Sequence, residues 1–521
     1  MAKSRTANTF YNFITSMFGE FLAIILQFVV RTVFIHTLGK SYLGINGLFS
    51  NILQMLSLAE LGVGSAILFK LYEPLSKNDK KRITILLKFY KRVYQIIGIV
   101  ITVLGLSLIP FLRYIVKDYN SLESLGINAV LIYLLFLIKT VSSYFFFAYK
   151  SAIVKADQKA YKLNLVNYIV TTITSFLQII VLVFVQSFEV YVGVSIFTTI
   201  LQNYLNARVA KKMYPYIDDK YEEKLDKKEM KDVFKDCSAL LIYKINGVVL
   251  KATDNIIISK FLGLGMVGLY SNYFILYSTI DTILGKVFES VLHSLGNLHT
   301  TEDKKHEYNI FKTVNFIAII LGATAGIGIA CVADEFVSTW IGKKWLLAQP
   351  FAILMGFEIY GLATRQYLSK YRSAMGLFKQ AKYRPIFGMI INLVVSLLLV
   401  KNYGICGVLV GTIVADWTTI MWYDPLIIHK YGFKNQFSIK KYYLKNFINV
   451  IICLITGIGC LFMCNHLFIN MGWISVIIHA ILVSIIVPGI YLLCFYKTDE
   501  ENELKKIINK FIKRRKIIKS N

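Results

Sequence analysis

The sequence predicts an all-α integral membrane protein with about fourteen transmembrane helices, in two parallel six-helix repeats followed by two extra C-terminal helices. Three observations predict this fold: long apolar stretches, an internal duplication, and an uneven distribution of Lys and Arg. The hydrophobic fraction of 56% and the mean hydropathy of +0.57 over 521 residues exceed what a soluble core needs. Water is therefore not the chain's main solvent.

The apolar stretches are long enough to cross a hydrocarbon core of about 30 Å. The first is too long for the apolar region of a signal peptide, and no small-residue cleavage site follows it, so we expect it to remain as a helix. The predicted spans lie near residues 10–35, 43–72, 91–115, 126–153, 162–185, 189–210, 237–261, 265–296, 308–332, 346–375, 381–401, 404–428, 445–466 and 472–496.

A duplication of roughly 220 residues relates the two halves of the chain. Tyr149-Lys150-Ser151-Ala152 recurs 222 positions later as Tyr371-Arg372-Ser373-Ala374. An earlier echo, Leu38-Gly39, returns 224 positions later as Leu262-Gly263. Each repeat holds six spans, and an even number makes the repeats parallel, with their symmetry axis along the membrane normal.

The net charge of +27 is distributed as a topology signal. With the N-terminus in the cytoplasm, about 44 of the 58 Lys and Arg lie inside and about 7 outside. This positive-inside pattern predicts that both termini are cytoplasmic, and it makes nucleic acid an unsuitable partner for the basic excess. Membrane phospholipids are the expected secondary partner, because the inner leaflet is anionic.

The expected domain organisation follows the repeat. Residues 1–212 form a first lobe, 237–430 a second lobe, and 431–496 the extra pair of spans. Residues 213–236 form a cytoplasmic linker that is either amphipathic or merely solvated, and 497–521 form a basic cytoplasmic tail. The seven cysteines contain no CxxC pair and the histidines no HExxH spacing, so we expect neither a metal site nor a bound cofactor.

Ionisable residues inside spans are costly and usually face a polar cavity or a partner. The first span places Glu20, Gln27 and Arg31 on one helical face, and the seventh does the same with Lys244, Lys251, Asp254 and Asn255. The repeat offset of 224 carries Glu20 onto Lys244, Gln27 onto Lys251 and Arg31 onto Asn255. Two polar faces therefore coincide under the duplication.

Two further helix pairs behave in the same way. An offset of 221 places Glu60 on Asp281, and 222 places Lys139 on Gly361, one turn from Arg365, the counterpart of Ser143. Three symmetric polar faces predict one cavity in the cleft between the halves. The alternative is structural: Arg31 and Glu20 satisfy one another as a buried pair, while Lys139 and Lys244 snorkel toward an interface.

The bases of this set suit an anionic substrate, because Arg forks onto phosphate oxygens and Lys acts as a point charge. They are Arg31, Lys139, Lys244, Lys251, Lys286 and Arg365. The acids either pair with these bases or exchange H⁺ or Na⁺ during transport. They are Glu60, Asp254, Asp281, Glu289, Glu358 and Asp416, and Glu20, Gln27 and Asn255 complete the expected polar lining. No catalytic set is expected.

Several diffuse motifs, in a specific order over residues 10–430, resemble the Wzx-type polysaccharide flippases. They are Arg31-Thr-Val-Phe-Ile-His-Thr-Leu-Gly39, Tyr42-Leu-Gly-Ile-Asn-Gly-Leu-Phe49, Leu58-Ala-Glu-Leu-Gly62, Leu71-Tyr-Glu-Pro74, Ala156-Asp-Gln158, Asp254-Asn-Ile-Ile-Ile-Ser259 and Leu269-Tyr-Ser-Asn272.

The resemblance implies the multidrug/oligosaccharidyl-lipid/polysaccharide (MOP) exporter fold, with two six-helix lobes around a V-shaped cleft. It implies movement of undecaprenyl-diphosphate-linked oligosaccharide across the bacterial cytoplasmic membrane by alternating access, alongside other polysaccharide-assembly proteins. It further implies that cavity bases hold the diphosphate, with the family's first-span arginine carried by Arg31. In related lipid II flippases the last two helices form a lipid-tail groove, which residues 445–496 match in number of spans only.

Two other functions remain open at this point. A cation-coupled drug or metabolite antiporter of the same fold would use the acids as substrate ligands. The excess of buried bases argues against this function. A membrane glycosyltransferase or polymerase would be an enzyme and would need a large extracytoplasmic loop. The longest predicted outside stretches, near residues 113–126 and 333–345, are short.

Overall fold

The computed structural model describes residues 5–117, 119, 122, 126–219, 221, 225–226, 252–301, 304–377, 380–469 and 471–505, without the side chains of 5–17, 58–63, 65–66 and 290–301. Contacts divide the chain into two compact units, Met1–Gly268 (unit 1) and Leu269–Asn521 (unit 2). The described residues form helices and turns and contain no β-strand, which confirms the predicted all-α class.

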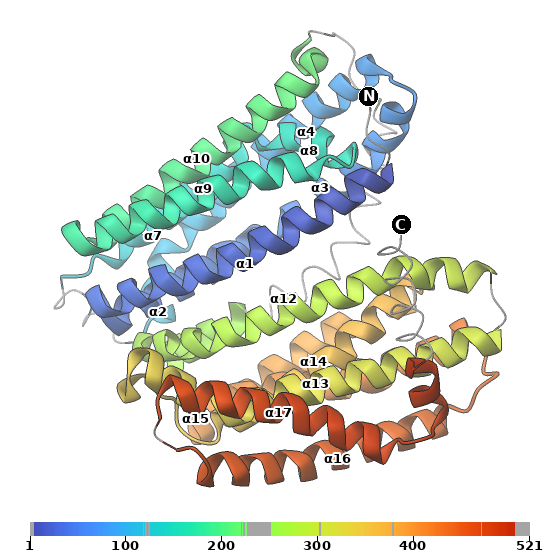
Figure 1. Cartoon of the computed structure of the whole chain (residues 1–521). Helices are drawn as coiled ribbons and strands as arrows, with labels where there is room; N and C mark the ends of the chain where they lie inside the picture. The colour runs from blue at the N-terminus through green and yellow to red at the C-terminus, as the bar shows by residue number, and fades with distance from the viewer. Residues whose placement is uncertain are drawn as a thin grey trace, which may run out of the picture. The chain divides into compact units, whose positions relative to one another are not determined.

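Unit 1 is a bundle of long helices joined by short helical turns (Figure 1). The long helices are α1 (Arg5–Thr37), α2 (Gly39–Leu56), α3 (Leu58–Ser76), α4 (Lys80–Ser107), α7 (Ala129–Phe145), α9 (Ala160–Ile180) and α10 (Phe188–Met213). The short elements are η1 (Ile109–Phe111), α5 (Leu112–Ile115), η2 (Ala148–Lys150), α8 (Ser151–Ala156), η3 (Val181–Val185) and η4 (Pro215–Asp218).

The predicted seventh span, 237–261, is described only from residue 252 onward. Residues 252–262 are helical and contact other parts of unit 1. The Ser259 hydroxyl lies 3.2 Å from the carbonyl oxygen of Ile115, and the Lys117 ammonium donates to the carbonyl of Phe261 at 3.1 Å. The repeat assigns this span to the second lobe, so its partnership with that lobe stays a prediction.

Unit 2 also consists of long helices (Figure 1). They are α12 (Leu264–Thr301), α13 (Lys304–Ile341), α14 (Phe351–Ala374), α15 (Arg384–Ile427), α16 (Ile439–His466) and α17 (Trp473–Cys494), with the turns η5 (Lys343–Trp345) and η6 (Ile428–Gly432).

Helix α15 contains two spans that fold back on one another. Gly404 has φ +55° and ψ −134°, a conformation that glycine tolerates and that breaks the helix. On either side of this break, Asn392 Nδ2 donates to Thr412 Oγ1 at 3.0 Å and Ser396 Oγ to the Val408 carbonyl at 3.3 Å. The two halves are therefore antiparallel, as expected for the predicted spans 381–401 and 404–428.

Each predicted span falls on a helix or, for 237–261, partly outside the described residues. One difference is that span 43–72 is divided at Ser57 into α2 and α3. In the described part, seven helices are long and apolar enough to cross a membrane, or eight if the bent α7–α8 pair is one span, with α15 counted once. The chain is therefore a multi-pass membrane protein, while the count of fourteen stays a prediction.

Helices begin where side chains can satisfy the first backbone amides. Asp79 Oδ1 accepts from the Arg82 amide at 2.9 Å before α4, and Asn128 Oδ1 accepts from the Leu131 amide at 3.0 Å before α7. Ser187 caps α10 in the same way. Such caps matter because unpaired backbone groups are costly near lipid.

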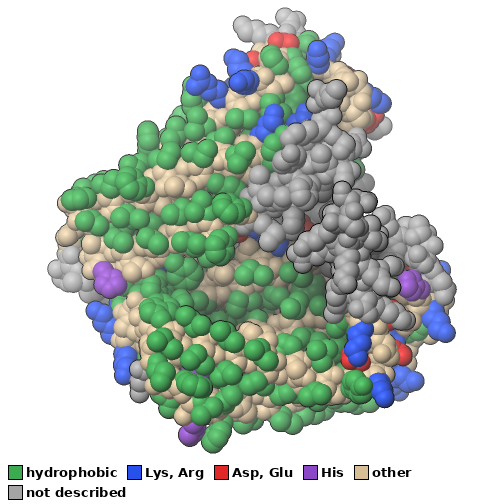
Figure 2. Space-filling view, in the orientation of Figure 1, with side chains coloured by type: hydrophobic (Ala, Val, Ile, Leu, Met, Phe, Trp, Pro, Cys, Tyr) green, Lys and Arg blue, Asp and Glu red, His purple; other side chains and the backbone are tan. Residues whose placement is uncertain are grey.

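The outward faces of the helices are apolar. Phe184 in unit 1 and Leu398 and Leu493 in unit 2 are 79%, 69% and 75% exposed. Figure 2 shows hydrophobic side chains over most of the visible helix surface, with Lys and Arg gathered near helix ends. Such surfaces would aggregate in water, so lipid is the solvent that they fit.

The repeated sequence motif forms a similar ion pair in each unit. In unit 1, the Lys150 ammonium lies 2.6 Å from Asp218. In unit 2, Arg372, the counterpart of Lys150, has its Nε 3.4 Å from Asp424. Burial raises the pKa of Asp218, but hydrogen bonds from Lys150 and Lys211 outweigh it and hold this pKa below its ordinary value. In both repeats the motif thus supplies a base that forms an ion pair with an aspartate at one end of the unit.

The two extra helices pack on α13 of unit 2. Cys453, Cys460 and Cys464 of α16 lie in one core with residues of α13 and α17. His479 of α17 is 2% exposed and contacts Glu335 of α13 at 2.9 Å. These cysteines therefore contribute to the packed core of unit 2.

Helices α13 and α14 cross at very close range through glycines. A Cβ on Gly322 would lie 2.7 Å from the Tyr360 carbonyl oxygen, and one on Gly326 would overlap the Gly356 carbonyl oxygen. Small residues allow such backbone approach in membrane helices. This contact fixes the position of α14, which carries Glu358 and Arg365.

We expect Gly326→Leu to destabilise unit 2, because backbone cannot move aside as a flexible side chain can. Overpacking of this kind costs about 1–3 kcal/mol or more. A thermal melt of the purified protein in detergent should show a lower midpoint and a lower folded yield. Gly459→Leu on α16, where no atom lies within 4 Å of the added Cβ, is the matched control and should melt like the wild type.

Candidate functional site

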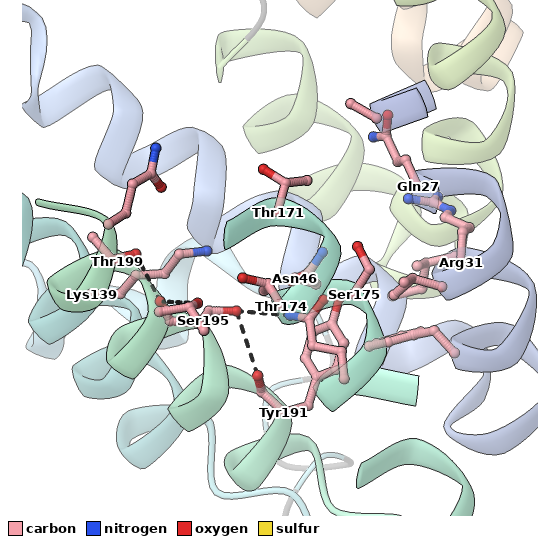
Figure 3. A pocket seen from close by; sticks show the side chains of 17 residues that line it. Gln27, Arg31, Asn46, Lys139, Thr171, Thr174, Ser175, Tyr191, Ser195 and Thr199 are labelled. Atoms are coloured by element: carbon pink, nitrogen blue, oxygen red, sulfur yellow. Dashed lines mark hydrogen bonds between the residues drawn. The ribbon is translucent and has the colours of Figure 1, made fainter. Parts of the chain in front are cut away.

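Unit 1 contains a polar cavity of about 460 Å³ among α1, α2, α7, α9 and α10 (Figure 3). Its lining is unusual for helices in lipid, because most of the lining side chains are polar. The lining residues are Ala23, Gln27, Val30, Arg31, Phe34, Leu43, Asn46, Lys139, Thr171, Thr174, Ser175, Gln178, Tyr191, Ser195, Thr198, Thr199 and Gln202.

Arg31 enters the cavity from α1, which aromatic packing holds against α10. Phe34, one turn further along α1, contacts Phe188 edge-on with ring centroids 5.7 Å apart and Tyr191 at 5.2 Å. Phe34 is 2% exposed, so this anchor is fully buried. Residues three positions apart lie on neighbouring parts of one helical face, so packing of Phe34 directs Arg31 toward the cavity.

Lys139 enters from α7 on the opposite side. Figure 3 shows its side chain and that of Arg31 extending from different helices into the same space. The Lys139 ammonium lies 6.0 Å from the Phe136 ring centroid. Among the described residues, no carboxylate lies within ion-pair distance of Lys139. A half-buried cation in a span, with no described carboxylate within reach, makes Lys139 a candidate for contact with an anionic ligand.

The neutral groups of the lining are oriented by their own helices. The hydroxyls of Thr174 and Thr199 donate to the carbonyls four residues earlier at 2.7 Å, and that of Thr198 does so at 2.8 Å. Gln178 Nε2 donates to Ser195 Oγ at 2.9 Å. A hydroxyl that donates to backbone keeps its lone pairs free to accept, so this wall offers acceptors for ligand hydroxyl groups.

The cavity's electrostatics favour anions. Its described lining contains Arg31 and Lys139 and no Asp or Glu. In the low dielectric of the membrane interior, two cations without an acid in the lining attract negative charge more strongly than in water. The arrangement can therefore hold a phosphate or carboxylate together with a polyhydroxylated group.

A second cluster of charges lies within unit 2. Arg365 Nη1 lies 2.9 Å from Glu358 Oε1 and in closer contact with Asp416 Oδ2, and Arg365 Nη2 lies 3.1 Å from the Tyr277 hydroxyl. Glu358 is 1% exposed, and its Oε2 has no hydrogen-bond partner in the described part. Two carboxylates thus share one guanidinium, which leaves one negative charge uncompensated within this cluster.

The duplication gives different outcomes at equivalent positions. Lys139 corresponds to Gly361, and a Cβ on Gly361 would lie 3.3 Å from the indole nitrogen of Trp417. Trp417 stacks on Phe357 with ring centroids 4.9 Å apart. At the position where the first repeat has the cation Lys139, the second repeat has Gly361, and the aromatic pair Trp417 and Phe357 packs beside it.

The structure brings several predicted site residues together. Gln27, Arg31 and Lys139 share the unit 1 cavity, and Glu358 and Arg365 share the unit 2 cluster with Asp416. Asp281 accepts a hydrogen bond from Gln366, the residue after Arg365. The common cleft between the halves stays a prediction, as do the roles of all these residues.

Other predicted residues lie elsewhere or outside the described part. Asp254 and Asn255 are buried on the 252–262 helix, and Glu20 is half-buried on α1 outside the described cavity lining. On α12, Lys286 is half-buried and Glu289 is exposed. Lys244, Lys251 and the side chain of Glu60 lie outside the described residues.

The neutral wall of the cavity was not predicted from the sequence, because its Ser, Thr and Gln residues carry no charge that marks them out within an apolar span. Thr171, Thr174, Ser175 and Gln178 are spaced i, i+3, i+4, i+7 on α9. The same spacing recurs on α10 with Ser195, Thr198, Thr199 and Gln202. Two polar faces of this kind on consecutive spans indicate a polar cavity.

Comparison with known proteins places this geometry in a family. A family model described as "Polysaccharide biosynthesis protein" matches residues 38–350, which is more than half of the chain. The chain belongs to this polysaccharide biosynthesis family. No curated protein matches the chain at a significant level.

Solved structures of other proteins share the fold of this chain. The lipid II flippase MurJ in an inward closed conformation superposes with a TM-score of 0.69 at 13% identity, covering 93% of this chain and 100% of that one. An inward-facing MATE transporter of the MOP superfamily gives 0.55 at 13% identity, with 78% and 94% covered. A mutant of the Vibrio cholerae MATE transporter VcmN gives 0.53 at 12% identity, with 82% and 99% covered. The predicted MOP exporter fold and polysaccharide family are confirmed.

Proposed function

We propose that the protein is a flippase that moves undecaprenyl-diphosphate-linked oligosaccharide repeat units across the bacterial cytoplasmic membrane for surface polysaccharide synthesis. One observation carries this proposal: the unit 1 cavity combines Arg31 and Lys139 with a wall of hydroxyl and amide groups and no acid in its described lining. A diphosphate requires the cations, and sugar rings require the neutral polar wall. The polyprenyl tail stays in lipid.

The cavity is large enough for part of such a headgroup. Its volume of about 460 Å³ lies within the range of about 300–1,000 Å³ typical of ligand sites. The diphosphate and the sugar attached to it form the part of the ligand that best matches this lining. Alternating access then exposes the headgroup first to one side of the membrane and then to the other.

The charge distribution and the family support a proposal for location and partners. The Lys and Arg asymmetry supports cytoplasmic termini, with membrane phospholipids around the protein. A repeat-unit flippase works with other polysaccharide-assembly proteins, which supply and consume its substrate. No cofactor is needed, since transport makes and breaks no covalent bond.

H⁺ or Na⁺ is the proposed coupling ion, and the unit 2 cluster is its best-supported site. Glu358, Asp416 and Arg365 together carry one excess negative charge, and Glu358 Oε2 is buried without a described partner. A bound cation or proton would neutralise the excess.

We expect Glu358→Gln to make transport insensitive to an imposed H⁺ or Na⁺ gradient, because the variant removes the carboxylate that would bind the ion. The measurement is headgroup flipping in proteoliposomes with and without the gradient. Glu73→Gln, which changes an exposed acid of α3 outside the predicted site, is the control and should leave flipping sensitive. A gradient response that Glu358→Gln leaves intact would contradict the assignment.

A cation-coupled drug antiporter of the same fold is the alternative function. MATE transporters share the fold, and the fold alone does not separate the two substrates. The absence of acids from the described cavity lining favours the anionic substrate. A polytopic glycosyltransferase is the weaker alternative, because the family and fold are those of transporters.

Flipping in proteoliposomes tests the proposal. Purified protein is reconstituted with a fluorescent undecaprenyl-diphosphate saccharide, and headgroup accessibility to an external quencher is followed over time. We expect faster transfer than in protein-free vesicles and no accumulation of cationic dyes. Dye accumulation without headgroup transfer would favour the antiporter, and a change in the saccharide's covalent structure would favour the enzyme.

A further inference from the structure

A second hollow of unit 1 lies apart from the polar cavity, between α9 and α10. Its volume is about 400 Å³, and its lining residues are Val166, Ile169, Leu205, Arg208, Val209 and Lys212. Four of the six are aliphatic, and the two cations are on α10. Ile169 is 59% exposed, so the groove is on an outward face of the unit.

The groove runs inward from the helix ends that are predicted to be cytoplasmic. Helix α9 begins at Ala160, so Val166 and Ile169 lie about 9 and 14 Å along its axis at 1.5 Å per residue. Helix α10 ends at Met213, which places Lys212 at the membrane edge and Arg208 about 6 Å deeper. Charge therefore lies at the edge, and the apolar wall lies at hydrocarbon depth.

The two cations are available to a ligand. Lys211, on the same turn, lies 3.1 Å from Asp218, a carboxylate that it shares with Lys150. Arg208 and Lys212 are exposed, and in the described part of the chain no carboxylate lies within ion-pair distance of either. Their spacing of four residues places both on one face of α10, one turn apart, at the rim of the groove.

We propose that this groove binds one anionic phospholipid of the cytoplasmic leaflet. The headgroup phosphate lies between Arg208 and Lys212, where Arg donates paired hydrogen bonds and Lys supplies a point charge. One acyl chain lies along the four aliphatic residues of the groove. The site is separate from the transport cavity, and its assignment rests on the proposed membrane orientation and not on the proposed substrate.

The lipid chemistry follows from the two ends of the groove. An aliphatic wall on an outward membrane face excludes a soluble anion as the main ligand, because free phosphate would leave that wall uncovered. A zwitterionic lipid would bring its own cation against Arg208 and Lys212. An anionic phospholipid matches both ends, and the inner leaflet supplies it.

Thermal melting of the full-length protein in detergent tests the site. Added dioleoyl phosphatidylglycerol should raise the melting temperature more than dioleoyl phosphatidylcholine does, because a ligand of the folded state stabilises it. In Arg208→Ala/Lys212→Ala the phosphatidylglycerol shift should fall to about half or less of the wild-type shift. Val209→Trp, which fills the groove and keeps both charges, should reduce the shift as well.

The control is Lys91→Ala/Arg92→Ala, which removes one exposed Lys and one exposed Arg from α4. It should keep the wild-type shift. An equal loss of the phosphatidylglycerol shift in this control would show diffuse attraction of anionic lipid and overturn the proposed site. An unchanged shift in Arg208→Ala/Lys212→Ala would also overturn it. Displacement of phosphatidylglycerol by an equimolar amount of undecaprenyl phosphate would assign the groove to the transported lipid and also overturn the proposal. Failure of headgroup flipping, with these shifts intact, would affect only the proposed function.

Discussion

Replacing Arg31 and Lys139 together by Ala is expected to abolish export of surface polysaccharide while the protein accumulates normally. Each residue supplies a charged hydrogen bond to the proposed diphosphate, worth about 1.5–3 kcal/mol, which corresponds to roughly 10- to 100-fold in affinity. The described lining of their cavity contains no Asp or Glu. Removing both cations therefore leaves no acid of that lining without a partner. The measurement is surface polysaccharide per cell, normalised to the amount of folded protein.

Conservative variants separate charge from geometry. Lys139→Arg should retain most export, and Arg31→Lys should retain less, because Lys cannot form the paired hydrogen bonds of a guanidinium. Lys401→Ala, an exposed lysine near the break within α15, is the matched control and should leave export unchanged. Normal export by the Arg31→Ala/Lys139→Ala variant at normal abundance would remove the cavity from the mechanism.

Arg365→Met is expected to destabilise unit 2 rather than to impair substrate binding alone. It would leave Glu358 and Asp416 facing each other without their shared cation. Removing one partner of a buried ion pair costs about 3–5 kcal/mol, because the remaining charge is buried without compensation. Thermal melting and size-exclusion chromatography should show a lower midpoint and less folded protein.

Neutralising the acids should reverse this loss. The triple variant Arg365→Met/Glu358→Gln/Asp416→Asn removes all three charges and should recover most of the wild-type melting temperature. Arg92→Met, an exposed arginine of α4, is the control for the loss of an arginine and should melt like the wild type. If Arg365→Met melted like the wild type and lost only flipping, Arg365 would act on the substrate's phosphates instead.

Hydropathy and the duplication predicted an all-α membrane protein built from two repeats, and the family resemblance predicted the MOP exporter fold. Spans 381–401 and 404–428 were predicted as separate spans, and the helix does break there, at Gly404, which adopts positive φ. The division of span 43–72 at Ser57 was not predicted, because apolar residues continue across the break and no Pro or Gly occupies it. Periodicity within a single apolar run cannot locate such a bend.

The site was predicted in part. Helical spacing and the repeat placed Gln27, Arg31 and Lys139 on inward faces, and all three line one cavity. Arg365 was predicted as an equivalent base, although Glu358, two turns earlier on the same helix, and Asp416 of α15 neutralise it. Sequence spacing shows which residues share a helix face, but not which acid on another helix reaches them.

The neutral wall was missed for a different reason. Thr, Ser and Gln are common in membrane helices, where they bond to their own backbone, so they attract less attention than charges. Only the matched spacing on α9 and α10, together with their packing, shows that these residues form one surface.

Binding of undecaprenyl diphosphate to the purified protein is the most direct test of the central claim, that the unit 1 cavity holds the diphosphate. Native mass spectrometry of the detergent-solubilised protein would compare the wild type with Arg31→Ala/Lys139→Ala and with Lys401→Ala at equal ligand concentration. We predict bound ligand in the wild type and in Lys401→Ala, and a loss of roughly 100-fold or more in affinity in the double variant. Equal binding by all three proteins would contradict the claim.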